Sequence, residues 1–141
     1  MQFNTSDVHA LLKELSNRIG TEGLNGNIYL VGGAAISFLN KDRHATSDID
    51  ALLHPAQPIL EIAKQMAIEK DLPVDWLNDA VKAFVPFNAD DFWEELQTFS
   101  NLTIWIAKPQ LLLAMKLRAN RGKRDTSDIE YLLDYLNIAS V

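Results

Sequence analysis

Apolar residues recur three and four positions apart in four stretches of the chain, and this spacing predicts amphipathic helices. The predicted helices are residues 6–19, 59–70, 109–119 and 127–137. Ser6 is the expected N-cap of the first helix, and Ser127 with Glu130 fits a capping box at the start of the last one. The helices are therefore predicted to bury one face and leave the other in water.

Shorter apolar runs between these helices have the length and composition of strands. The predicted strands are residues 28–31, 48–53, 72–77 and 102–107. Gly32 and Gly33 are expected to form a tight turn that leads into a short helix at residues 34–39. The acidic aromatic segment 90–95 is expected to form a short helix or a lid. Strands alternating with helices, without a repeat or a linker, predict a single α/β (α+β) domain over residues 1–141.

The charge distribution narrows the kinds of partner that the chain can have. A net charge of −6 argues against a protein that coats nucleic acid. However, five of the 13 Lys and Arg residues lie within residues 116–124, and such a local basic segment suits an anionic substrate held at one place. The chain contains no cysteine, no apolar run long enough for a membrane span and no signal-peptide pattern, so we expect a cytoplasmic protein without thiolate chemistry.

Asp48 and Asp50 are the strongest chemical signal in the sequence. Alternation along a strand places both carboxylates on one face, with Cα atoms roughly 7 Å apart. Aspartate is depleted in strands, and two like charges at this separation repel each other unless a cation lies between them. Oxygen ligands beside a helix N-terminus suit Mg²⁺ together with a phosphate. The alternative is a purely structural pair of surface aspartates.

Four further residues are candidates for the same site. Asp75, in the predicted strand 72–77, could supply a third carboxylate, or could simply face water; Asp79 is the competing candidate. Lys116 could neutralise a triphosphate as a point charge, or could be an ordinary solvated helix residue. Asp128 is expected to stabilise a helix N-terminus, and could also orient the basic side chains.

The glycine pair and the aspartate pair together resemble a known signature. Val31-Gly32-Gly33, followed after a helix and a loop by Ser47-Asp48-Ile49-Asp50-Ala51-Leu52, is similar to the motif of the DNA polymerase beta nucleotidyltransferase superfamily. The likeness extends to small prokaryotic nucleotidyltransferase-like proteins of abortive-infection and toxin–antitoxin systems, and covers roughly residues 28–133. It implies a polymerase-beta-like fold, with helices packed on a mixed sheet.

The resemblance also implies a reaction and a role for each candidate residue. Asp48, Asp50 and Asp75 would hold Mg²⁺ or Mn²⁺, and Asp75 would also help to deprotonate an acceptor hydroxyl. The groups implied in NTP binding are Gly32, Gly33, Ser47, Lys116 and Arg121. The acceptor hydroxyl would attack the α-phosphorus and release pyrophosphate.

Two functions follow from the resemblance. The first is a nucleotidyltransferase whose acceptor is an RNA or tRNA end, a partner protein or a small molecule. The alternative is a catalytically weak module of the same fold that binds a nucleotide or a partner, for example as a toxin–antitoxin component.

Overall fold

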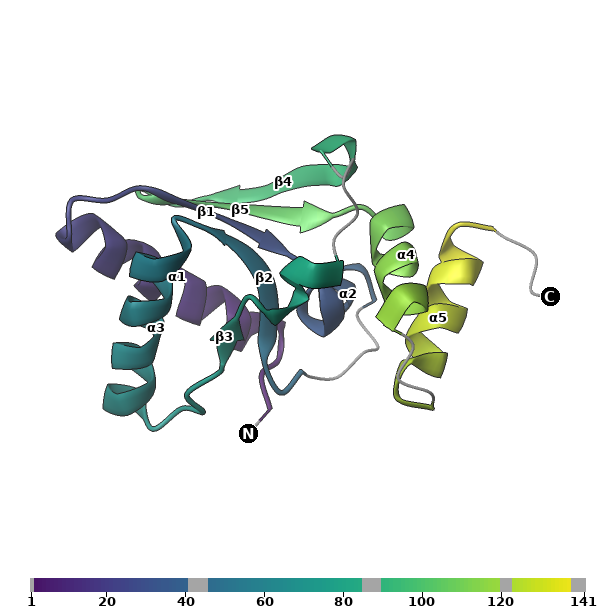
Figure 1. Cartoon of the computed structure of the whole chain (residues 1–141), viewed down its shortest axis with the longest axis horizontal. Coiled ribbons are helices and arrows are strands. Elements are labelled where there is room, and N and C mark those ends of the chain that lie inside the picture. Colours follow the sequence, from purple (N-terminus) through teal and green to yellow (C-terminus); the bar gives the residue numbers. More distant parts are fainter. Residues whose placement is uncertain (1, 41–45, 85–89, 120–122, 138–141) are drawn as a thin grey trace.

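A five-stranded mixed sheet forms the centre of the molecule (Figure 1). The computed structural model describes residues 2–40, 46–84, 90–119 and 123–137. The strands, in sheet order, are β3 (Leu77–Asn78), β2 (Ile49–His54), β1 (Gly26–Leu30), β5 (Leu102–Ala107) and β4 (Trp93–Thr98). β1 is antiparallel to β2 and parallel to β5, β3 is parallel to β2, and β4 is antiparallel to β5.

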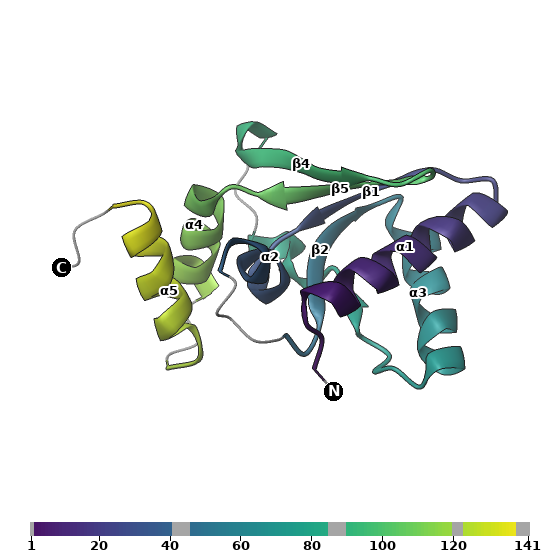
Figure 2. The same cartoon turned by 180° about the vertical axis from the view of Figure 1, so that it is seen from behind.

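Helices pack on one face and at one end of this sheet. They are α1 (Thr5–Thr21), α2 (Gly32–Leu39), α3 (Ala56–Lys70), α4 (Pro109–Ala119) and α5 (Lys123–Tyr135), with short 3₁₀ helices η1 (Ala80–Phe84) and η2 (Asp90–Phe92). α1 and α3 lie together on the face seen in Figure 2, and α4 and α5 form a pair beside α2. The predicted α/β class, with helices on a mixed sheet, is confirmed. Within the described ranges, no helix has the length and apolar character needed to cross a bilayer.

Two predicted helix caps, Ser6 and Ser127, are wrong, and each has a local reason. α1 is capped by Asn4 rather than Ser6: Asn4 Oδ1 accepts a 2.8 Å hydrogen bond from the Asp7 backbone N–H, and Asp7 Oδ2 accepts one of 3.0 Å from the Asn4 N–H. α5 begins at Lys123, so Ser127 lies inside the helix and is not its cap. The first turn of α5 is polar, and the apolar spacing therefore becomes visible only from Ile129 onward.

The predicted strand 72–77 is also wrong, because most of it forms a turn. The Trp76 N–H donates to the Pro73 carbonyl at 3.0 Å, which closes the turn. Trp76 is fully buried and its indole N–H donates to the Ala63 carbonyl of α3 at 2.8 Å. Pairing with β2 begins only at the Trp76 carbonyl, which accepts from the Ile49 N–H at 2.7 Å. Asp75 is consequently a turn residue and not a strand residue.

The short helix predicted in the acidic aromatic segment 90–95 is present over Asp90–Phe92 (η2), and the rest of the segment is a strand rather than a lid. After η2, the chain continues as β4, an edge strand of the sheet, which pairs with β5 through a register shift between Glu95 and Gln97. Most β4 residues are exposed, so the strand lacks the apolar alternation that predicts one. Glu94 and Glu95 place charges on this edge, which protects it against pairing with other chains.

Candidate active site

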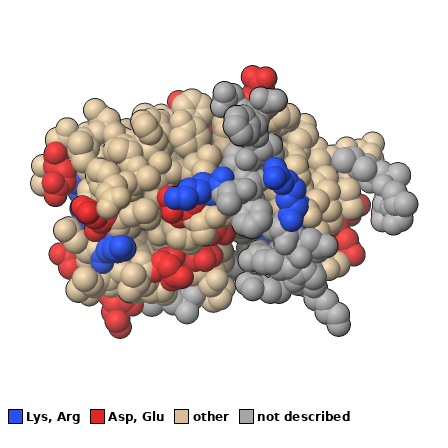
Figure 3. Space-filling view, in the orientation of Figure 1, with Lys and Arg blue, Asp and Glu red and all other residues tan. Residues whose placement is uncertain are grey.

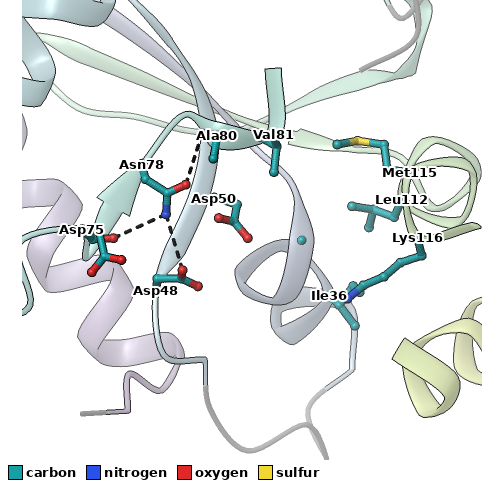
Figure 4. A pocket seen from close by; sticks show the side chains of 11 residues that line it. Ile36, Asp48, Asp50, Asp75, Asn78, Ala80, Val81, Leu112, Met115 and Lys116 are labelled. Carbon is teal, nitrogen blue, oxygen red and sulfur yellow. Dashed lines mark hydrogen bonds between the residues drawn. The ribbon is translucent and has the colours of Figure 1, made fainter. Parts of the chain in front are cut away.

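A pocket of about 520 Å³ lies between the sheet, η1 and α4 (Figure 4). Its apolar wall includes Ile36 from α2 and Leu112 and Met115 from α4. Its polar lining side chains are Asp48, Asp50, Asp75, Asn78 and Lys116. The structure therefore brings five of the predicted site residues to one cavity, together with an asparagine that the sequence did not single out; the five are Gly32, Asp48, Asp50, Asp75 and Lys116.

Asp48 and Asp50 reach the pocket because β1 and β2 are antiparallel. The end of β1 then lies beside the start of β2, where the Val31 N–H donates to the Asp50 carbonyl at 3.0 Å. Ile49 and Ala51 point into the core, and the Asp50 side chain points to the opposite, half-buried face. The Thr46 hydroxyl donates to the Asp48 carbonyl at 2.8 Å and fixes the approach to the strand.

Gly32 allows α2 to start directly after β1. Its φ of +63° lies in the left-handed region, and a Cβ atom at this position would lie 2.9 Å from Asp50 Oδ2. Glycine is thus required both by the backbone conformation and by the close contact with the carboxylate. The sequence predicted a tight turn at Gly32 and Gly33 followed by a helix over residues 34–39. This is wrong, since Gly32 and Gly33 are the first residues of the helix. Ser47 is exposed and is not among the residues that line the pocket.

A Gly32→Ala variant is expected to lose about 1–3 kcal/mol of unfolding free energy, because it adds the contact with Asp50 to the strain of a positive φ. Gly23→Ala is the matched control: Gly23 also has a positive φ, of 73°, but a Cβ there meets nothing within 4 Å. Urea denaturation measures the loss of unfolding free energy in both variants, and the difference between the two losses is the cost of the contact with the carboxylate. Equal losses in the two variants would show that this contact has no energetic cost.

Asn78 is the residue of β3 that faces the aspartate pair. It pairs in register with Asp50 on β2. Its Nδ2 lies 3.4 Å from Asp48 Oδ2 and 3.4 Å from the Asp75 carbonyl, and its Oδ1 accepts from the Ala80 N–H at 3.2 Å. In Figure 4 the Asn78 amide lies between Asp75 and Asp48, and the exposed Asp75 carboxylate lies on the far side of Asn78 from Asp50.

The competing third carboxylate, Asp79, lies outside the pocket lining and pairs with Lys82 at 3.6 Å. In the described part of the chain, no three His, Cys, Asp or Glu side chains are grouped so that they could hold a metal ion. The donor set at this place is therefore the two carboxylates of Asp48 and Asp50, because Asn78 turns its Nδ2 toward Asp48 and its Oδ1 toward the Ala80 N–H. These are hard oxygen donors, and they fit Mg²⁺ or Mn²⁺, which complete their coordination with water and phosphate oxygens.

Lys116 forms the opposite wall of the pocket. It extends from α4 across the cavity from Asp50 (Figure 4). Its Nζ lies 3.2 Å from Asp128 Oδ2 of α5, and both side chains are less than a tenth exposed. Asp128 is the sixth residue of α5, so its expected place at the helix N-terminus is wrong, whereas its expected orientation of a basic side chain agrees with this contact. Arg121 lies outside the described residues.

The surface around the pocket carries charges of both signs. Figure 3 shows acidic and basic side chains close together near the middle of this face. The described part of the face has no continuous basic stripe that could follow a long nucleic acid.

An aspartate pair at the start of one strand, beside a glycine-led helix that follows the neighbouring strand, is consistent with a nucleotidyltransferase-like fold. Residues 7–138 match the model of the family described as "Nucleotidyltransferase of unknown function (DUF6036)", and the chain belongs to this family. No curated protein and no solved structure matches the chain. The predicted nucleotidyltransferase class is thereby confirmed at the level of the family, while the metal, the acceptor and the toxin–antitoxin role stay predictions.

Proposed function

We propose that the protein is a metal-dependent nucleotidyltransferase, which transfers a nucleoside monophosphate from an NTP to an acceptor hydroxyl. The observation that carries this proposal is the placement of Asp48 and Asp50 against Gly32 at the start of α2, with Lys116 across the same pocket. One wall of the pocket is anionic and the other is cationic. A nucleoside triphosphate with a divalent cation has the complementary charges.

Asp48 and Asp50 would hold Mg²⁺ or Mn²⁺, and the bound cation would neutralise negative charge on the phosphates. The backbone N–H groups at the start of α2, including that of Gly33, would donate to phosphate oxygens. Lys116, whose Nζ lies 3.2 Å from Asp128 Oδ2, would place its positive charge beside the triphosphate. Asp75, at the exposed rim of the pocket, is the proposed acceptor of the hydroxyl proton.

The transfer needs no reactant other than the NTP and the acceptor hydroxyl. A bond forms between the acceptor oxygen and the α-phosphorus, and the bond from that phosphorus to the bridging oxygen of the β-phosphate breaks. Pyrophosphate leaves, and the acceptor proton passes to a carboxylate or to water. The contribution of the protein is to position the two reactants and to stabilise the charge on the phosphates.

The test is a transfer assay with the four NTPs, each labelled at the α-phosphate, in Mg²⁺ or Mn²⁺. The acceptors are an RNA 3′ end, tRNA, a protein panel and small hydroxyl compounds. We expect label on one class of acceptor and an equal amount of pyrophosphate, loss of both with a chelator, and recovery when Mn²⁺ is added back. Absence of both products with every NTP and acceptor would contradict the proposed reaction.

A second candidate function is a nucleotide-binding module without turnover, for example as one component of a toxin–antitoxin pair. It is favoured by one observation: among the described residues, no third carboxylate joins Asp48 and Asp50 in a metal-binding group. Calorimetry would distinguish the two functions. NTP binding without pyrophosphate release, over the same panel of acceptors, would identify the binding module.

A further inference from the structure

We infer that Asn78 sets the charge of the cation site, so that a divalent cation binds tightly only together with the phosphates of the nucleotide. The inference rests on the proposed function for the identity of the site. It adds a positioning residue, and it predicts that the cation binds more tightly with the triphosphate than alone. It starts from the place of Asn78 on β3, which pairs with β2 on the side away from β1.

Position 78 is the place from which β3 can contribute a side chain to the aspartate pair. Asn78 is in register with Asp50, and neighbouring strands lie about 4.8 Å apart. Its amide nitrogen is 3.4 Å from Asp48 Oδ2. A side chain at this position therefore lies in register with Asp50 and reaches Asp48, whereas the Asp75 carboxylate is turned away from Asp50 on the far side of the amide (Figure 4).

The two ends of the Asn78 amide have different partners, and a carboxylate could satisfy only one of them. Oδ1 accepts from the Ala80 N–H, which an aspartate oxygen could also do. Nδ2 is directed at Asp48 Oδ2 and at the Asp75 carbonyl, both of which are acceptors. An aspartate at position 78 would replace this donor with a third negative charge beside Asp48 and Asp50. The amide thus orients Asp48 when no cation is bound.

An amide instead of a carboxylate at position 78 also sets the negative charge of the cation site. Affinity for a hard divalent cation rises with the number of charged oxygen ligands. With Asn78, the described part of the site presents two carboxylates rather than three. The phosphate oxygens of a nucleotide supply the missing charge, so the cation and the triphosphate must each increase the affinity for the other by the same factor.

The experiment measures binding of Mn²⁺ alone by calorimetry, and the melting temperature with and without Mn²⁺. In the wild-type protein, we expect inorganic triphosphate to increase Mn²⁺ affinity at least tenfold. Asn78→Asp should bind Mn²⁺ alone at least tenfold more tightly than the wild type, melt at a lower temperature without Mn²⁺, and show a larger rise in melting temperature when Mn²⁺ is added. Asn78→Ala should not gain affinity.

Asp75→Asn is the matched control, because it removes the other nearby carboxylate and leaves Asn78 in place; its Mn²⁺ affinity should equal that of the wild type. Equal Mn²⁺ affinity in Asn78→Asp and wild type would overturn the inference, as would a wild-type protein whose Mn²⁺ affinity does not change with triphosphate. The wild-type measurement decides the matter even if Asn78→Asp does not fold. If the Mn²⁺ affinities are as expected but no nucleotidyl transfer is detected, the role of Asn78 in setting the charge of the site is supported. Only the proposed reaction is then contradicted.

Discussion

An Asp50→Asn variant is expected to keep its fold and to lose about 10³-fold or more in the rate of nucleotidyl transfer, which corresponds to roughly 4 kcal/mol of activation free energy. Asparagine has nearly the same shape as aspartate, and the Val31 N–H bond to the residue 50 carbonyl is unaffected. The substitution removes one of the two carboxylate charges at the place where the cation and the phosphates would meet. Initial rates of label transfer, compared at equal protein concentration, measure the effect.

Asp79→Asn is the control for this variant, since Asp79 is close in the fold but outside the pocket lining. It should transfer label at the wild-type rate. The melting temperature of Asp50→Asn without metal should equal or exceed that of the wild type, because repulsion between Asp48 and Asp50 is removed. A variant that is more stable and fully active would show instead that the aspartate pair is only structural.

An Asp128→Ala variant is expected to lose about 3–5 kcal/mol of unfolding free energy. Lys116 and Asp128 form an ion pair in which both side chains are almost completely buried. Removal of one partner leaves the other charge in a desolvated place, which costs more than the pair itself contributes. Guanidinium denaturation, with wild-type and variant slopes compared, measures the loss.

The double variant Lys116→Met/Asp128→Leu separates stability from function. Both charges are replaced by apolar side chains of similar size, so most of the stability should return. Binding of inorganic triphosphate should not return, because the cationic wall of the pocket has been removed. A loss below 1 kcal/mol in Asp128→Ala would show that the ion pair is not important for the fold.

Local sequence patterns predicted most of the sheet and the anionic half of the site. Strands β2 and β5 were found from short apolar runs, and the alternation along β2 placed Asp48 and Asp50 on a common face. The contact between Gly32 and Asp50 could not be predicted in the same way. It depends on β1 and β2 being antiparallel neighbours, which is a property of the whole sheet.

The positions of Asn78 and Lys116 in the site depend on contacts that produce no periodic pattern in the sequence. β3 has only two residues, too few for alternation, so neither its start nor the place of Asn78 could be predicted. β4 is an exposed edge strand whose charged residues resemble those of a loop. The contact of Lys116 with Asp128 joins two helices, and the angle between such helices is set by tertiary packing.

The parallel pairing of β1 with β5 has a consequence for how the pocket forms during folding. Asp48 and Asp50 join β1 through a pairing that is local in the sequence. Lys116 follows β5, whose partners on β1 are distant in the sequence, as Trp105 beside Tyr29 shows. Long-range pairing requires closure of a large loop and is therefore the slower event. The anionic wall can form early, and the cavity gains its cationic wall only when the two distant halves of the sheet join.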